Sequence, residues 1–163
     1  MIEDTRTGQL VAANILPVDP EDIEFVTGWR FDWRAEVAEA EVFKLVGEVK
    51  PAEILGLMSV LRRQGYIEVR LLESAPGNVG RLKRWRGIAG NLLAFAAQLS
   101  FASGGEGFVL LVAKTELINH YQTLYGFVRH GHSQKMVLDT LAAMNLIKAF
   151  EKGPGDGNSP RTG

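Results

Sequence analysis

Cysteine is absent from this sequence, and its absence rules out several kinds of chemistry. Without cysteine the chain forms no disulfide bond, offers no thiolate to a metal and has no thiol nucleophile. Long apolar runs are missing as well, because no stretch approaches the ~20 residues of a membrane-spanning helix. The first ten residues, MIEDTRTGQL, carry acids where a secretory signal is basic. These absences predict a cytoplasmic protein that does not engage a membrane.

An excess of either charge is also missing. The formal net charge of the 163 residues is −1, which supplies no general field for attracting nucleic acid or acidic membranes. A polyanion would therefore need a local patch, and one such patch contains Arg81, Lys83, Arg84 and Arg86. The overall balance argues against nucleic acid as the main partner.

The apolar content predicts a single globular domain. Apolar residues make up 46% of the chain and charged residues 23%, which suits one buried core. The final segment, EKGPGDGNSPRTG, is rich in Gly and Pro and has no periodic apolar residue. We therefore predict one domain over residues 1–150 and a flexible tail over residues 151–163.

Runs of β-branched and large apolar residues predict a series of strands. Four such runs cover residues 10–16, 42–46, 54–61 and 67–71, and the first is expected at a sheet edge because prolines follow it. In the fourth run, IEVRL, apolar and charged residues alternate as in a half-buried strand. Glu73 has the parity of the apolar residues, so we expect its carboxylate on their face, at the cleft where the strand ends. Residues 25–41 show no clear period.

The second half of the chain predicts a βαβ unit. A turn-rich segment leads into an apolar helix over residues 87–101, and the run FVLLVA, 108–113, is typical of a central strand covered on both faces. A short helix capped by Thr115 and ended by Gly126 follows, then two strands and a helix over 140–150. The predicted fold class is therefore α/β (α+β). Ligands of a βαβ unit bind beyond the carboxyl ends of its strands, so a ligand is expected there.

The stretch RLKRWRGIAGNLLAF, residues 81–95, places cations and glycines directly before a helix. The first amides of a helix have no earlier carbonyl to bond, and the helix dipole adds positive potential there. Gly87 and Gly90 let an anion such as a diphosphate approach the backbone, and Arg84 and Arg86 can add charged contacts. The alternative is a tight turn with solvated cations, and spacing alone does not separate the two.

Two common nucleotide motifs are absent from this stretch. A P-loop needs Gly-Lys-Ser/Thr, where this chain has Gly90-Asn91-Leu92. The dinucleotide fingerprint needs three glycines in GxGxxG after a short link, and here Gly87 and Gly90 follow a long loop. The sequence therefore argues against ATP or GTP hydrolysis and against nicotinamide binding.

The hexapeptide Arg84-Trp85-Arg86-Gly87-Ile88-Ala89 resembles the R/Q-x-x-G-x-G/A pattern of the GNAT superfamily of N-acetyltransferases. Tyr125-Gly126-Phe127 is similar to a second signature of that family, and the likeness covers about residues 54–137. It implies a mostly antiparallel sheet with a βαβ cofactor core and acetyl-CoA as acetyl donor. It also implies that the cofactor's pyrophosphate is held by Arg84, Trp85, Arg86, Gly87, Ile88, Ala89, Gly90 and Asn91.

The resemblance implies a reaction in which an amine attacks the thioester directly. Glu73 is the candidate general base, with an exposed loop acid as the alternative. The family's tyrosine acid falls four residues before the glycine of Gly-Phe, where this chain has Gln122. One extra residue in the last helical turn would bring Tyr121 into place, so Tyr121 is the candidate acid and Tyr125 the runner-up.

His120 is a further alternative as acid or base, although a histidine on a short helix is more often structural. His130 and His132 have no third ligand in register, so no metal site is predicted.

Two hypotheses on function remain open. The first is an acetyl-CoA-dependent N-acetyltransferase that acts on a small-molecule or protein amine, with an RNA-borne amine not excluded. The second is a catalytically silent acyl-CoA-binding or protein-interaction module of the same fold. Glu73 and Tyr121 favour the first, and the displaced tyrosine favours the second. Variable loops, and in a homodimer a second subunit, would select the acceptor.

Overall fold

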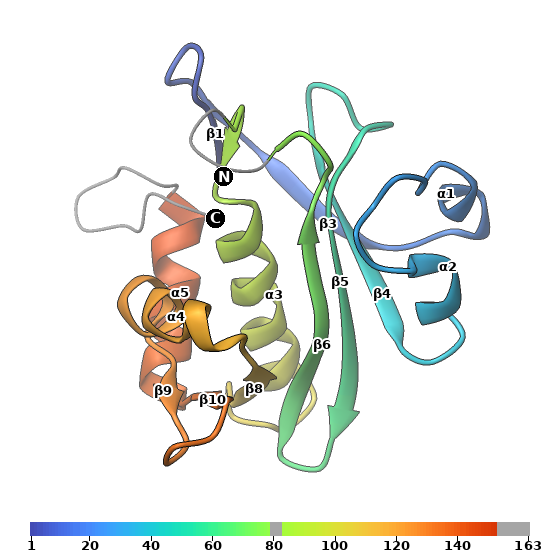
Figure 1. Ribbon diagram of the computed structural model, residues 1–163. Coiled ribbons are helices and arrows are strands. Elements are labelled where there is room, and N and C mark those ends of the chain that lie inside the picture. The colour runs from blue at the N-terminus through green and yellow to red at the C-terminus, as the bar shows by residue number, and fades with distance from the viewer. Residues whose placement is uncertain (79–82, 153–163) are drawn as a thin grey trace.

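A seven-stranded mixed sheet forms the centre of the computed structural model, which describes residues 1–78 and 83–152 (Figure 1). Its strands, in spatial order, are β3 (Ala13–Pro17), β4 (Glu41–Gly47), β5 (Ile54–Arg63), β6 (Tyr66–Ser74), β8 (Val109–Val112), β10 (Lys135–Leu138) and β9 (Val128–Arg129). All neighbours are antiparallel except β6 and β8, which are parallel. The predicted mixed, mostly antiparallel sheet with a βαβ unit is confirmed.

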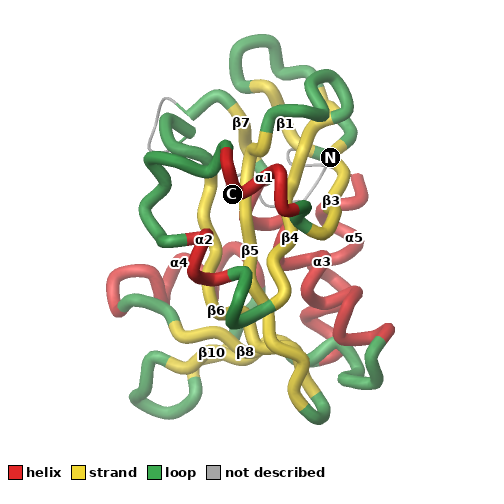
Figure 2. The backbone as a smooth tube through the Cα atoms, turned by 90° about the vertical axis from the view of Figure 1, so that its right-hand side faces the viewer, coloured by secondary structure: helices red, strands yellow, loops and turns green. Residues whose placement is uncertain are grey.

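Helices cover both faces of this sheet. Helices α3 (Ile88–Ala102) and α5 (Thr140–Lys152) lie on one face, and the short helices α1 (Pro20–Glu24) and α2 (Trp33–Glu36) lie on the other, as Figure 1 shows. Figure 2 looks onto the face that carries α1 and α2. Helix α4 (Ile118–Tyr125) follows a single 3₁₀ turn, η1 (Thr115–Leu117), after β8. No helix in the described part of the chain is long and apolar enough to cross a membrane.

A second, small sheet joins the start of the chain to the segment before α3. Strand β1 (Ile2–Asp4) pairs antiparallel with both β2 (Leu10–Val11) and β7 (Trp85–Arg86). The run 10–16, predicted as one strand, is thus divided between two sheets. Its second part forms the sheet edge, as predicted, because β3 pairs with β4 alone.

A β-bulge in β6 decides which side chains face which side. Ser59 of β5 lies opposite Leu71, and the next residue, Val60, lies opposite Val69, so Arg70 is the extra residue. Before the bulge, Val69 packs in the core under α3, whereas after it Leu71 packs with Trp33 on the opposite face. The prediction that Glu73 shares the face of Val69 is therefore wrong, because an inserted residue reverses the alternation.

Three smaller predictions also need correction. Strand β8 is not covered on both faces, since Val112 is 63% exposed. Thr115 does not cap α4; its hydroxyl accepts a hydrogen bond from Gln134, and η1 precedes the helix. Helix α5 continues through Lys152, so the tail does not begin at 151, and residues 153–163 lie outside the described part.

Gly90 is required by packing between α3 and α5. A Cβ atom at this position would collide with the ring of Phe150, which is itself buried in the main core. The absent side chain lets the two helices approach closely at the point where α3 begins.

We expect Gly90→Ala to lower the free energy of unfolding by about 1–3 kcal/mol, despite the better helix propensity of alanine, because the new methyl group overpacks the core. Urea unfolding measures the loss. Combining Gly90→Ala with Phe150→Leu makes room for the methyl group, so the double variant should lose less than the sum of the single variants. Additive losses would contradict the contact.

Candidate active site

A cavity of about 570 Å³ opens between β6 and β8. The two strands pair from Ile67 with Val109 to Val69 with Leu111, and the pairing ends where the bulge at Arg70 begins. Beyond that point the cavity is lined by both strands, by the loop after β6, by α4 and by residues of the segment 28–31. The opening lies beyond the carboxyl ends of the parallel pair, where the βαβ unit predicts a ligand.

The start of α3 offers free amides to an anion. Gly87 is the N-cap residue, with a φ of 96°, and no side chain caps the first turn, which contains no acid. Only glycine adopts this backbone conformation readily. The amides of Ile88, Ala89 and Gly90 fall in the first turn, so the dipole and the amides together favour a negative ligand there.

Two asparagines hold the residues before this helix. Asn78, nearly fully buried, accepts a hydrogen bond from the Trp85 amide at 2.8 Å and donates to the Trp85 carbonyl at 3.1 Å. Asn91 donates to the carbonyls of Gly87 at 2.6 Å and Met1 at 2.8 Å. Both side chains are thus occupied with backbone, and Arg81 lies outside the described residues.

The Glu73 carboxylate fastens the segment before α2 to strand β6. It accepts hydrogen bonds from the amides of Arg30 at 2.6 Å and Phe31 at 3.1 Å, and from the indole N–H of Trp33 at 2.9 Å. The bulge makes this contact possible, because it turns Glu73 toward Trp33 rather than toward α3. Both carboxylate oxygens accept at least one of these bonds.

A second carboxylate, on α2, binds side chains of β5 and β6. Glu36 of α2 is buried and accepts a hydrogen bond from the hydroxyl of Ser59. It also accepts hydrogen bonds from two nitrogens of Arg70, both at 3.1 Å. The Ser59 hydroxyl also accepts the amide of Leu71 at 3.1 Å. The extra residue of the bulge is therefore held by its own side chain and by its neighbour's amide.

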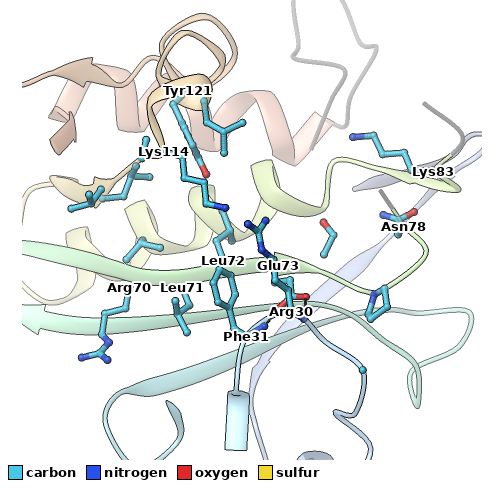
Figure 3. Close-up of a pocket in the computed structure, with 18 residues that line it drawn as sticks. Arg30, Phe31, Arg70, Leu71, Leu72, Glu73, Asn78, Lys83, Lys114 and Tyr121 are labelled. Atoms are coloured by element: carbon cyan, nitrogen blue, oxygen red, sulfur yellow. Dashed lines mark hydrogen bonds between the residues drawn. The ribbon is translucent and has the colours of Figure 1, made fainter. Parts of the chain in front are cut away.

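Tyr121 and Tyr125 lie in different surroundings. Tyr121 lines the cavity together with Lys114, and Figure 3 shows the Tyr121 hydroxyl pointing into it. Tyr125 is buried against Phe150. The amide of Gly126 donates to the carbonyl of Tyr121, five residues earlier, where α4 ends at this left-handed glycine.

Burial and charge shift two pKa values near the cavity. Burial raises the pKa of the Tyr121 hydroxyl, so the phenol remains protonated at neutral pH. Burial, together with the nearby Lys83 ammonium, lowers the pKa of His120, so its imidazole is neutral. Among the described residues that line the cavity, Glu73 is the one carboxylate, whereas Arg30, Arg70, Lys83 and Lys114 are cations.

No group of three or more histidines and acids within residues 1–78 and 83–152 is arranged to hold a metal ion.

No protein-family model and no curated protein matches the sequence. Solved structures match it in shape. SpeG, a spermidine/spermine N-acetyltransferase from Vibrio cholerae, has a TM-score of 0.57 over 82% of this chain and 98% of its own, at 15% identity. A GNAT family acetyltransferase from Elizabethkingia anophelis with acetyl-CoA bound has a TM-score of 0.52 over 73% and 78%, at 16% identity. This chain has the GNAT fold.

A third GNAT-like structure has a different ligand. AtaT, complexed with acetyl-methionyl-tRNAfMet, has a TM-score of 0.53 over 83% of this chain and 99% of its own, at 13% identity. At such identities the likeness extends to the fold and no further.

Within the GNAT fold, the predicted site residues are distributed over three places. Glu73 and Tyr121 line the cavity, Arg84, Trp85 and Arg86 precede α3, and residues 87–91 form its first turn. Sequence reasoning missed Glu36, Ser59 and Arg70, because a bulge leaves no local pattern. The sequence also did not reveal that residues 2–4 form a strand beside the segment before α3.

We expect Glu73→Gln to lower the free energy of unfolding by about 1–3 kcal/mol, because an amide NH₂ would face N–H donors that need an acceptor. Chemical denaturation measures the change. Glu68→Gln is the matched control on the same strand, where the carboxylate pairs with a surface arginine and its loss costs about 0–1 kcal/mol. Equal effects at the two positions would contradict the anchoring contact.

Proposed function

We propose that this protein is an acetyl-CoA-dependent N-acetyltransferase that transfers the acetyl group to a primary amine by direct attack. The observation that carries the proposal is the cavity between β6 and β8, whose wall contains the Tyr121 hydroxyl. Helix α3, which connects these two strands, begins without a side-chain cap. The GNAT fold supports it, since neighbours of this fold are acetyltransferases and one was solved with acetyl-CoA bound.

The cofactor follows the strands in this proposal. Its diphosphate lies at the first turn of α3, near Arg84 and Arg86, and the pantetheine arm extends into the gap between β6 and β8. There its amides can bond strand groups that no neighbouring strand uses, much as an added strand would. The thioester then reaches the part of the cavity lined by Tyr121 and Lys114.

Tyr121 is the proposed acid. The neutral amine attacks the thioester carbonyl and gives a tetrahedral intermediate with an oxyanion and a positively charged nitrogen. The carbon–sulfur bond then breaks with the electron pair leaving on sulfur, and the proton lost from nitrogen restores the Tyr121 hydroxyl directly or through solvent. Because burial raises the pKa of Tyr121, its hydroxyl carries the proton that the departing thiolate needs. The runner-up, Tyr125, is buried in the core, which favours a packing role.

The contacts of Glu73 favour a role other than general base. A carboxylate that already accepts three N–H bonds holds the segment 30–33, and a proton taken from the amine would compete with those donors. We therefore propose Glu73 as a positioning residue for the acceptor wall. An α-amino group, with a pKa of about 7.7–8.0, loses its proton to solvent far more readily than a lysine does.

The charge of the cavity bears on the acceptor. The described lining residues include four cations, Arg30, Arg70, Lys83 and Lys114, and one carboxylate, Glu73, so the lining carries net positive charge. A polycation such as spermidine, the substrate class of SpeG, is repelled by such a lining. The proposal therefore favours a small-molecule, protein or RNA-borne amine of lower charge.

The alternative proposal is a module that binds acyl-CoA without transferring the acyl group. Both proposals require CoA binding, and they differ in the role of Tyr121. An acetyl-transfer assay over a panel of amines, with CoA release as the readout, separates them.

We expect Ala89→Asp to abolish CoA binding while leaving the protein as stable or more stable. An acid in the first turn of α3 interacts well with the helix dipole, by about 0.3–1 kcal/mol, but repels a diphosphate at the same place. Saturating CoA should raise the stability of the unmodified protein by about 2.7 kcal/mol at 100 times its Kd. Thermal shift measures both effects, and Ala89→Asn controls for size. A full CoA shift in Ala89→Asp would refute the diphosphate site.

Tyr121→Phe should slow acetyl transfer by about 10²–10⁴-fold, since it removes the proposed proton donor, with little change in CoA affinity. Tyr125→Phe is the matched control on the same helix and should retain activity. Steady-state kinetics and calorimetry measure the two quantities. Equal effects of the two substitutions would contradict the assignment of Tyr121 as the acid.

A further inference from the structure

Strand β1 shapes the segment that precedes α3. Its backbone pairs with β7, so that Glu3 lies opposite Arg86 and Asp4 opposite Trp85. The Thr5 amide donates to the Arg84 carbonyl at 2.7 Å, and the Thr5 hydroxyl lies 2.8 Å and 2.9 Å from the carbonyl oxygens of Lys83 and Arg84. The shape of the segment thus depends on residues about eighty positions earlier in the chain.

Ile2 anchors this strand in the main core, because its side chain is fully buried. The strand is therefore a fixed part of the fold in the described structure.

Two ion pairs cross the same strand pair. Arg84 lies 3.5 Å from the Asp4 carboxylate, and Arg86 lies 3.6 Å from the Glu3 carboxylate. The arginine side chains are 43% and 40% exposed, whereas the carboxylates are only 13% and 17% exposed. The cations can therefore turn toward a ligand in solvent, while the acids are held in place.

The acids balance a cluster of like charges. Burial, and then the charge of Arg86, lowers the pKa of Lys83, which shows that the cations before α3 lie close enough to repel one another. Glu3 and Asp4 offset that repulsion with two negative charges beside the same arginines. A diphosphate at the start of α3 would supply the same compensation.

We propose that β1 has two opposite effects on the cofactor site, an inference that rests on the proposed binding of acetyl-CoA. Thr5 and the strand pairing hold the segment before α3 in its binding shape, so Thr5 is a positioning residue. Glu3 and Asp4 are built-in competitors: they occupy Arg86 and Arg84 until a diphosphate takes their place. The acids thereby keep CoA affinity below what the cations alone would give.

The test measures the Kd of CoA and of inorganic pyrophosphate by calorimetry, at low and at physiological salt. Glu3→Gln combined with Asp4→Asn keeps the shape of both side chains and removes their charge. It should tighten binding of both ligands by about 3- to 10-fold, as expected for two partly exposed ion pairs, with a steeper salt dependence. Glu39→Gln removes an exposed acid elsewhere and should change neither ligand's Kd.

Thr5→Val tests the positioning role. It should weaken CoA binding by about 3- to 10-fold, a typical cost for a lost hydroxyl bond, without a change in salt dependence. Thr5→Ser, which keeps the hydroxyl, should restore affinity.

The outcomes separate this inference from the proposed function. If the unmodified protein binds neither CoA nor pyrophosphate, the proposed function fails. If it binds CoA, and the folded charge variant binds both ligands no more tightly, the inference is overturned. Circular dichroism establishes folding. If the double variant does not fold, Glu3→Gln alone is tested, and its expected gain in affinity is half that of the double variant on a logarithmic scale.

Discussion

The hydrogen bonds around Arg70 are the interaction on which the rest of this structure depends. They hold one extra residue in β6, and that residue separates β6 from β8 and turns the following side chains to the other face. The Arg70 guanidinium and the Ser59 hydroxyl converge on the buried Glu36 carboxylate. Removing either partner would leave the buried Glu36 charge uncompensated, which lowers the free energy of unfolding. The bulge, the cavity and the position of α2 therefore form one linked arrangement.

The same arrangement explains why two short helices suffice on the second face. Helices α1 and α2 contain 5 and 4 residues and would not be stable alone. Glu36 joins α2 to the bulge, and Glu73 joins the segment before α2 to the end of β6. These two carboxylates bind across the same interface in opposite directions. Together with the apolar cluster around Trp33, they fix the segment 30–36 relative to β6.

The sequence predicted the part of the fold that follows β6 better than the face that carries α1 and α2. The βαβ unit, the start of α3 and the placement of Tyr121 follow from signals within one or two elements: an apolar period, a glycine before a helix, and a helical position. The bulge depends on Ser59 and Glu36, which are eleven and thirty-four residues from Arg70, so no local pattern reveals it. The packing reason for Gly90 could not be predicted either, because its contact with Phe150 joins two helices that are distant in sequence.

The pairing of β1 with β7 has a consequence for how the protein reaches its working state. Contacts between residues so distant in sequence carry a large loop-closure entropy and tend to form after local ones. The hairpin of β5 and β6 and the long helix α3 can form early from neighbouring residues, whereas the segment before α3 takes its shape only when the first residues of the chain dock on it. The segment before α3 is therefore expected to take its final shape late in folding.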